Sequence, residues 1–264
     1  MEFLEWTGWF AAVVVGVVLG FLGGGGSTLA VPTLVYLLDV PADSATGYSL
    51  FIVGLSALVG TYSSSRHGHV AWRTGFLFAL PSMVAVFAVQ RWVLPAIPAS
   101  FELAGHPFGR NQMIMFLFAL LMVGAAWSMI RKTKEVSPVN QGSKAVWLVP
   151  LEGLIIGGVT GLVGAGGGFL IIPALVFLVG LDIKKAIGTS LFIIAMKSGI
   201  GFFGALGNGL PFDWNLLLPF AGLTMVGALV GVQLRKKADP NSVKTLFGWF
   251  LIVTAILILA GELS

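Results

Sequence analysis

The chain has 264 residues, of which 57% are hydrophobic and 10% charged, with a net charge of +4, a mean hydropathy of +0.96 and no cysteine. The missing cysteines exclude disulfide bonds and thiol chemistry, and long continuous apolar runs disfavour a β-barrel, which needs short alternating segments. Several charge-free runs have the length of about 20 residues that crosses a bilayer core as a helix. The sequence therefore predicts an all-α polytopic membrane protein.

Glycine interrupts the first apolar block, residues 8–38. The block contains Gly20-Phe-Leu-Gly-Gly-Gly-Gly-Ser27. At about 1.5 Å per residue it is too long for one helical crossing of a ~30 Å core and too short for two. We expect a re-entrant broken-helix hairpin, in which residues 8–22 enter, Gly23–Gly26 turn at mid-membrane and residues 27–38 return.

Ordinary spans follow, and then the whole pattern repeats. Spans are predicted at 44–65, 74–95 and 111–130, and the second half has a broken block at 146–180 followed by spans at 185–207, 214–234 and 242–261. The loop around 95–110 has no counterpart in the second half, and nothing in the sequence indicates its role.

Two copies of one segment show that the chain is duplicated. With an offset of 141 residues, Gly20 to Phe51 superposes on Gly161 to Phe192 without a gap, and Pro32 pairs with Pro173. We therefore divide the chain into a first repeat (1–131), a cytoplasmic linker (132–145) and a second repeat (146–264).

The distribution of Lys and Arg distinguishes hairpins from full crossings. Eight full spans would divide the charges outside the membrane eight to six, whereas two hairpins leave twelve on one face and only Arg91 and Arg110 on the other. The hairpins are therefore favoured. Each half then has three spans, so the repeats are inverted, as in many secondary transporters, and both termini face the non-cytoplasmic side.

The two breaks are candidates for a binding site, because backbone that leaves a helix in hydrocarbon must be buried by protein or satisfied by a ligand. Ser27 and Gly168 begin the returning half-helices, with Pro32 and Pro173 near their first turns, and helix N-termini favour anions. The candidate substrate-binding residues here are Gly23, Gly24, Gly25, Gly26, Ser27, Thr28, Gly164, Gly166, Gly167, Gly168 and Phe169. Alternatively, the glycines only allow close helix packing.

Hydroxyl groups follow each break at matching positions. Gly47-Tyr-Ser49 and Gly188-Thr-Ser190 lie just past the first turn of the next span. Ser49, Thr189 and Ser190 are either secondary ligands of the substrate or bonded only to their own backbone.

Lys197 lies in the middle of a predicted span, where a charge is costly and marks a functional site by default. It stands seven residues after Ser190, on nearly the same helix face, and its counterpart in the first repeat is Ser56. Lys197 either attracts a substrate or forms a structural pair, for which Glu152 is the candidate partner. Glu152 itself either carries a coupling proton or caps a helix.

No constellation of catalytic residues stands out, so enzyme activity is not expected, and no cofactor is implied. The pair His67-Gly-His69 lacks the further ligands that a metal site requires. The net charge reflects the loops and does not indicate nucleic acid. The expected partners are a small anionic substrate and the lipid bilayer.

The segment Gly161-Leu-Val-Gly-Ala-Gly-Gly-Gly-Phe-Leu-Ile-Ile-Pro173, followed by Ala186-Ile-Gly-Thr-Ser-Leu191, resembles the TauE/SafE (YfcA-like) family of sulfite and organosulfonate exporters. The first copy has the same form. The resemblance implies a secondary transporter in the bacterial inner membrane that exports a small sulfur-containing anion by alternating access. An anion channel and a non-transporting membrane scaffold are the alternatives.

Two residues depart from the pattern of that family. Lys197 stands where a neutral polar residue such as Asn is expected, and Tyr48 replaces the Thr of the first Gly-Thr-Ser. Both are candidates for retuning the choice of substrate.

Overall fold

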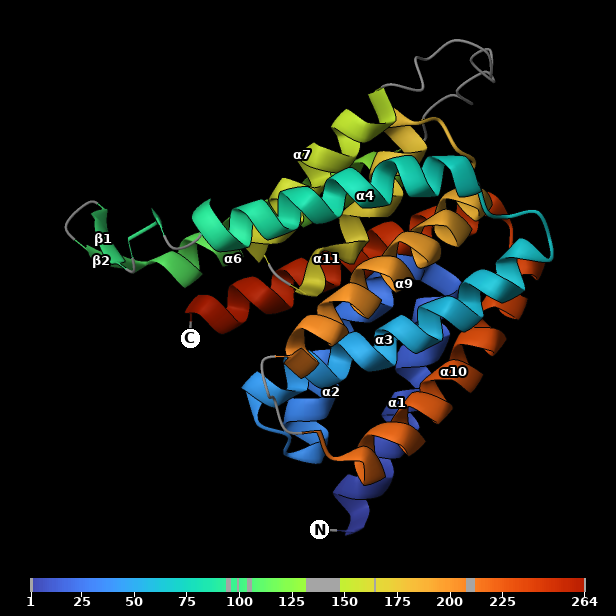
Figure 1. The fold of residues 1–264 in the computed structure, drawn as a ribbon, viewed down its shortest axis with the longest axis horizontal. Coiled ribbons are helices and arrows are strands. Elements are labelled where there is room, and N and C mark those ends of the chain that lie inside the picture. The colour runs from blue at the N-terminus through green and yellow to red at the C-terminus, as the bar shows by residue number, and fades with distance from the viewer. Residues whose placement is uncertain are drawn as a thin grey trace.

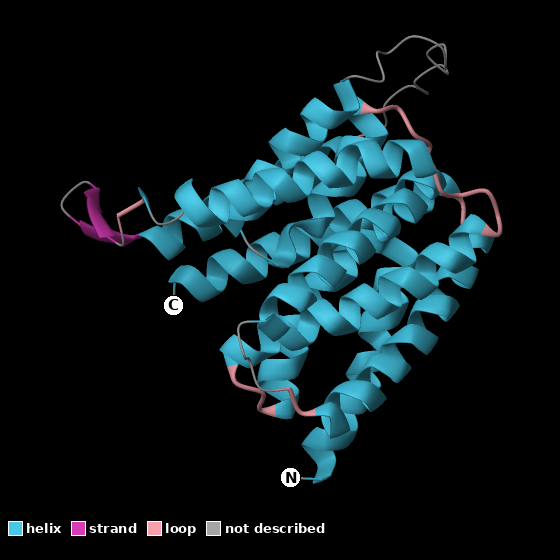
Figure 2. Cartoon of the chain, viewed as in Figure 1, coloured by secondary structure: helices cyan, strands magenta, loops and turns pink. Residues whose placement is uncertain are grey.

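The computed structural model describes residues 2–93, 96–98, 100–103, 106–131, 148–163, 165–207 and 212–263, and these are almost entirely helical (Figure 2). In chain order the elements are α1 (Glu2–Leu22), the 3-10 segment η1 (Gly23–Gly26), α2 (Ser27–Leu38), α3 (Ala42–Ser65), α4 (Trp72–Ala88), the π-helical segment η2 (Val89–Val93), β1 (Ser100–Leu103), β2 (His106–Gly109), α6 (Arg110–Ile130), α7 (Leu148–Val163), the 3-10 segment η3 (Ala165–Leu170), α8 (Ile171–Pro173), the π-helical segment η4 (Ala174–Leu178), α9 (Ile183–Gly207), α10 (Trp214–Lys237) and α11 (Pro240–Leu263).

Six helices within the described ranges are long and apolar enough to cross a bilayer. They are Ser44–Ser65, Trp72–Val93, Gln112–Ile130, Ile183–Gly207, Trp214–Lys237 and Pro240–Ala260. Each agrees with a predicted span to within three residues at either end, because charged, Pro-containing or Gly-containing segments bound the apolar runs. The prediction of an all-α polytopic membrane protein is confirmed.

The first broken block folds back on itself, as predicted for residues 8–38. Gly23 has a φ of +68°, in the left-handed region that glycine adopts without a steric cost. Beyond this turn, Gly26 packs against Leu19, and at the far end Gly8 packs against Leu38. Segments α1 and α2 therefore run side by side in opposite directions.

The second broken block is less regular than predicted. The returning half-helix is present as the helical run Gly168–Leu178, but its geometry changes along the chain from η3 through the three-residue α8 to η4. Pro173 ends α8 and has no N–H to continue an α-helical pattern, and Val179 N–H then bonds to the carbonyl of Ala174, five residues back. Pro32 lies in the second turn of α2. The expectation that both prolines stand near the first turn of a half-helix is therefore wrong.

Helices of the two halves pack in matching pairs. The most extensive contacts join α1 to α10, α7 to α4, α3 to α9 and α6 to α11, a set that is unchanged when the halves are exchanged. Backbones approach closely in the first two pairs, where Gly16 packs against Thr224 and Gly157 against Ser82. This pattern supports a two-fold relation between the halves. Their inversion across a membrane stays a prediction.

The loops gather at two ends of the molecule. Ala71 N–H donates to Thr189 Oγ1 (2.9 Å) and Lys184 Nζ to the carbonyl of Lys236 (3.1 Å), so the α3–α4 loop, the start of α9 and the end of α10 lie together. Both chain ends lie toward the opposite side, as does a small hairpin (Figure 1). The hairpin pairs β1 with β2, Ser100 opposite Gly109, inside the loop whose structure the sequence did not indicate. The predicted linker, 132–145, lies outside the described residues.

Candidate substrate cavity

The two glycine breaks meet near the centre of the molecule. A Cβ on Gly24 would overlap the carbonyl oxygen of Gly168, so side-chain-free backbone is required at this contact. Ser27 closes the turn from the same side, since its hydroxyl donates to the carbonyl of Gly24 at 2.7 Å. The structure thus brings together the breaks that the sequence places 141 residues apart.

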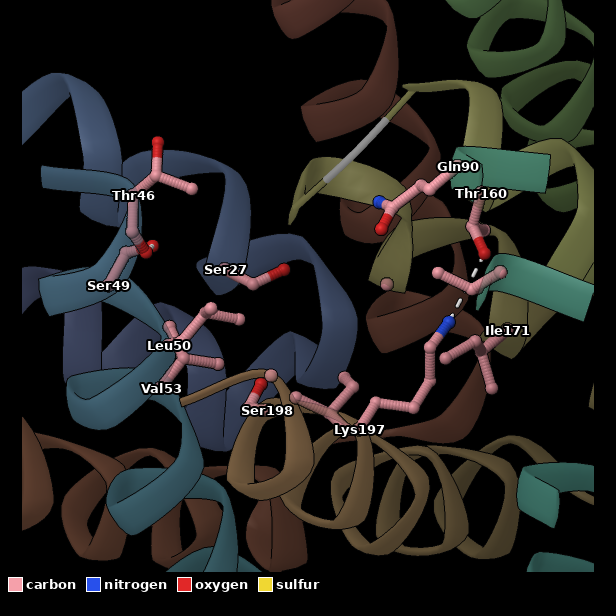
Figure 3. A pocket seen from close by; sticks show the side chains of 14 residues that line it. Ser27, Thr46, Ser49, Leu50, Val53, Gln90, Thr160, Ile171, Lys197 and Ser198 are labelled. Atoms are coloured by element: carbon pink, nitrogen blue, oxygen red, sulfur yellow. Dashed lines mark hydrogen bonds between the residues drawn. The ribbon is translucent and has the colours of Figure 1, made fainter. Parts of the chain in front are cut away.

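A cavity of about 310 Å³ lies beside this contact (Figure 3). Both halves contribute to its wall, through the elements α2, α3, α4, η2, α7, η3, α8 and α9. The lining residues are Ser27, Thr46, Ser49, Leu50, Val53, Val86, Gln90, Thr160, Gly168, Ile171, Ile194, Lys197, Ser198 and Gly201. The residues from α3 lie near its beginning, and those from α9 and η2 lie toward the ends of α9 and of the second span. The cavity therefore lies between the breaks and the end of the molecule opposite the α3–α4 loop.

Polar groups divide the cavity into two parts. On one side Lys197 Nζ donates to Thr160 Oγ1 at 3.1 Å, and Gln90 lies next to them (Figure 3). On the other side lie the hydroxyls of Ser27 and Ser49. An ammonium group has three N–H donors, and Thr160 takes one. The remaining donors are available to a ligand in the cavity.

The predicted pair of Lys197 with Glu152 is not formed, and the partner of Lys197 Nζ is Thr160 Oγ1. Glu152 stands eight residues earlier on the same helix, two turns and about 12 Å along its axis. Thr160 Oγ1 also donates to the carbonyl of Gly157 at 3.1 Å. The hydroxyl is thus fixed by its own helix and offers its lone pairs to the ammonium.

The structure separates the predicted site residues into groups. The cavity is lined by Ser27, Ser49, Gly168 and Lys197. Gly23, Gly24 and Gly26 pack closely in the first break, and Gly24 meets Gly168 of the second. Gly25 belongs to η1, Thr28 to α2, and Gly166 and Gly167 to η3. Gly164 lies outside the described residues. Phe169 is buried against the ring of Phe118, with centroids 5.0 Å apart, and has a packing role.

The paired serines bond to their own helices. Ser49 Oγ donates to the carbonyl of Thr46 and Ser190 Oγ to that of Ile187, both at 2.8 Å. Only Ser49 also lines the cavity. Ser190 is fully buried, and a Cβ on Gly23 would come within 2.7 Å of its hydroxyl. Ser190 therefore supports the first break and does not face the cavity.

Thr189 and Tyr48 each bond to the residue that precedes a helix. Thr189 Oγ1 accepts from the N–H of Ala71, the residue before α4, and Tyr48 Oη accepts from the N–H of Asp213, the residue before α10, at 2.6 Å. These are equivalent contacts in the two halves. Neither residue lines the cavity, and the substrate roles expected for Thr189 and Tyr48 stay predictions.

Four polar residues of the cavity were not among the predicted site residues: Thr46, Gln90, Thr160 and Ser198. Gln90 lies within the predicted span 74–95, beside Arg91, and nothing in its local sequence distinguishes it from a residue near a helix end. Thr160 lies four residues before the second break, and this position within an apolar block was the signal that could have found it.

The polar side of the cavity is not repeated in the other half. At the offset of 141 residues the counterparts of Lys197 and Thr160 are Ser56 and Leu19. The matching contacts of Gly157 with Ser82 and of Gly16 with Thr224 pair Gln90 with Val232, and all three counterparts are buried. Ser56 donates to Thr224 Oγ1 at 2.9 Å, a bond between neighbouring helices. A cation and two polar groups thus face the cavity from one side of the repeat axis only.

Side chains pack tightly at the end opposite the cavity. Arg235 is fully buried there and donates to the carbonyl of Gly20 and to Ser64 Oγ, both at 2.7 Å. A Cβ on Gly188 would overlap the carbonyl of His69. Burial lowers the pKa of the His69 imidazole, and the positive charge of Arg235 adds to this effect. This end is therefore closed.

Proteins that are similar over most of the chain are described as probable membrane transporters. A probable membrane transporter protein of Xylella fastidiosa (strain 9a5c) is 29% identical over 256 residues, which cover 93% of this chain and 91% of that protein. A probable membrane transporter protein of Haemophilus influenzae is 29% identical over 275 residues, which cover 92% of this chain and 95% of that protein. The probable membrane transporter protein YdhB of Bacillus subtilis is 27% identical over 223 residues, which cover 83% of this chain and 86% of that protein.

No solved structure matches the chain. The family described as "Sulfite exporter TauE/SafE" matches residues 9–258, nearly the whole sequence. Together with the six spanning helices, this match identifies a multi-pass membrane protein of a transporter family. The chain belongs to the sulfite exporter TauE/SafE family.

Proposed function

We propose that the protein is a secondary transporter that exports a small sulfur-containing anion, such as sulfite or an organosulfonate, by alternating access around the cavity at the two breaks. The observation that carries the proposal is the ammonium of Lys197, which lies in the cavity wall and donates to a hydroxyl, not to a carboxylate. A charge inside a membrane protein is costly unless it meets a counter-charge. An anionic substrate supplies that counter-charge.

The helix dipoles contribute less to anion binding than the sequence suggested. Segment α1 ends and α2 begins at the same break, so a partial negative and a partial positive charge lie side by side and offset each other. The second half repeats this arrangement, because α7 ends at the break from which the helical run Gly168–Leu178 begins. Lys197 is therefore the main source of positive potential in the cavity.

The packing at the other end supports a carrier in preference to a channel. The cavity lies on one side of the breaks, while Arg235 and the contact of Gly188 with the α3–α4 loop close the other side. A carrier requires such a barrier, which moves during each transport cycle, and an open channel does not. With both termini outside the cytoplasm of a bacterial cell, the cavity faces outward and the closed end faces the cytoplasm.

Flux measurements on the purified protein in proteoliposomes test the proposal. We expect at least one of sulfite, sulfoacetate, taurine, thiosulfate and sulfate to show saturable flux at the rate of a carrier. Flux far above carrier turnover would favour a channel. Absence of flux for every one of these compounds, with protein shown to be folded, would contradict the proposed function.

Cysteine labelling tests the orientation, because the chain contains no cysteine of its own. We expect cysteines at Arg66 and Lys185, both exposed, to react only from the cytoplasmic side, and one at Pro41 only from outside. Arg235 is unsuitable as a cytoplasmic reporter because it is buried. Eight full crossings would place residues 66 and 185 on opposite faces, so labelling of the two from different sides would disprove the hairpin topology.

A further inference from the structure

We infer that the cavity selects its substrate by charge and accepts anions with one negative charge over anions with two. This inference rests on the proposed function and concerns which members of the substrate class the same cavity takes. It follows from the ionisable groups in the cavity wall and from the shape of the space between them.

One unit of positive charge is available to the ligand. Among the described residues that line the cavity, Lys197 is the only ionisable one. The other polar groups are the amide of Gln90 and the hydroxyls of serine and threonine residues, which can donate hydrogen bonds but carry no net charge. Arg235 is buried in the closed end, where it bonds to Gly20 and Ser64. Arg91, the chain neighbour of Gln90, is exposed and is not among the lining residues.

The rest of the wall makes a second negative charge costly. Leu50, Val53, Val86, Ile171 and Ile194 form an apolar surface around the polar groups. A charge transferred from water to such a site is unfavourable unless it is paired. A monoanion is neutralised by Lys197, whereas a dianion leaves one charge that only hydroxyls and an amide can solvate.

The wall also offers nothing to a positively charged group on the substrate. No carboxylate occurs among the described lining residues, and the ammonium of Lys197 would repel a second ammonium. Zwitterionic sulfonates should therefore be transported less well than monoanions of the same length. The class that fits is a sulfur oxyanion with one charge and a neutral remainder.

Methanesulfonate and sulfate form a pair that isolates the charge, since both are tetrahedral, have the same number of heavy atoms and differ by one unit of charge. In proteoliposomes we expect the wild-type protein to transport methanesulfonate at least about tenfold faster than sulfate at equal subsaturating concentrations, equivalent to about 1.4 kcal/mol. Sulfite gives a second test, because it gains a proton near neutral pH. Its flux relative to that of methanesulfonate should rise as the pH is lowered through neutrality.

A second positive charge in the cavity should change this selectivity. Gln90 lies beside Lys197 and Thr160 and is exposed, so a lysine there has room to extend toward water (Figure 3). We expect Gln90→Lys to raise sulfate flux relative to methanesulfonate by at least about tenfold. Gln90→Asn, which keeps a neutral amide, is the matched control and should leave the ratio within about twofold of the wild-type value.

The outcomes distinguish the inference from the function on which it rests. Equal transport of sulfate and methanesulfonate by the wild-type protein overturns the charge selectivity but leaves the transporter intact. A folded Gln90→Lys protein with an unchanged ratio also overturns it. If neither these anions nor sulfite move at all, the proposed function fails and the inference fails with it. The wild-type ratio requires no variant, so a poorly folded Gln90→Lys protein does not remove the test.

Discussion

Gly24→Val should abolish transport while the protein still inserts in the membrane and purifies. The added Cβ would overlap the backbone carbonyl of Gly168, and a backbone in a packed contact cannot move aside as the end of a flexible side chain can. The two breaks would be pushed apart, and the cavity that adjoins them would change shape. Flux in proteoliposomes and thermal unfolding, measured on the same preparation, report the two effects separately.

Gly222→Val is the matched control for this prediction. Gly222 lies on the exposed side of α10 and has no other atom within 4 Å of the position that a Cβ would occupy. The Gly222→Val protein should transport the anion at close to the wild-type rate. If Gly24→Val transported at the wild-type rate, the glycine cluster would serve only close helix packing, and the proposed role of the break would be wrong. Gly25→Val and Gly166→Val, in the same two breaks, should abolish flux as well.

Lys197→Met should weaken anion binding by more than tenfold, or about 1.4 kcal/mol, and leave the stability of the protein equal or improved. Methionine keeps the volume of the lysine stem and removes a charge that is costly inside a membrane protein. No carboxylate loses a partner, because Lys197 donates to Thr160, and Thr160 keeps its bond to Gly157. Anion binding and thermal stability are the two measurements.

Two further variants make the Lys197 test specific. Thr160→Val removes the hydroxyl partner and keeps the charge, so it should reduce binding less than Lys197→Met does. Lys197→Asn, which restores a neutral polar group, should shift selectivity among anions. If Lys197→Met is less stable by about 3–5 kcal/mol, as expected for a broken buried pair, and binds anions normally, the lysine is structural and the proposed substrate role is wrong.

The spans could be predicted from sequence because crossing a membrane requires a long, apolar helix. A helix that crosses hydrocarbon satisfies all of its own backbone groups, so length, apolarity and the positions of Lys and Arg decide its boundaries. The first break was equally legible, since four glycines, Gly23–Gly26, interrupt an otherwise apolar run. Local rules were sufficient in both cases.

The second break and the cavity wall depend on information that is not local. The irregular path through η3, α8 and η4 follows from packing around Pro173, and its counterpart Pro32 is accommodated within a regular helix. Gln90 and Thr160 lie in apolar runs in which any single polar residue has several possible explanations. Their role became visible only when the fold placed them beside Lys197.

Thr189 and Tyr48 have a contact that the sequence did not indicate. Thr189 was a candidate ligand beside the paired serine and Tyr48 a departure from the family pattern, and each accepts a hydrogen bond from the residue that precedes a helix of the other half. Both hydroxyl groups accept a hydrogen bond from a backbone N–H at equivalent positions, although the tyrosine side chain is longer than that of threonine. A substitution between the repeats therefore need not mean a change of substrate.

The glycine-mediated contacts of α1 with α10 and of α7 with α4 have an evolutionary consequence. Each broken helix lies against a helix supplied by the opposite half, so one half alone would leave that surface uncovered. An ancestor with a single half would have needed a second copy of itself. Fusion into one chain would fix the ratio of the two halves at one to one and allow their sequences to diverge. Lys197 in one half and Ser56 in the other are a product of that freedom.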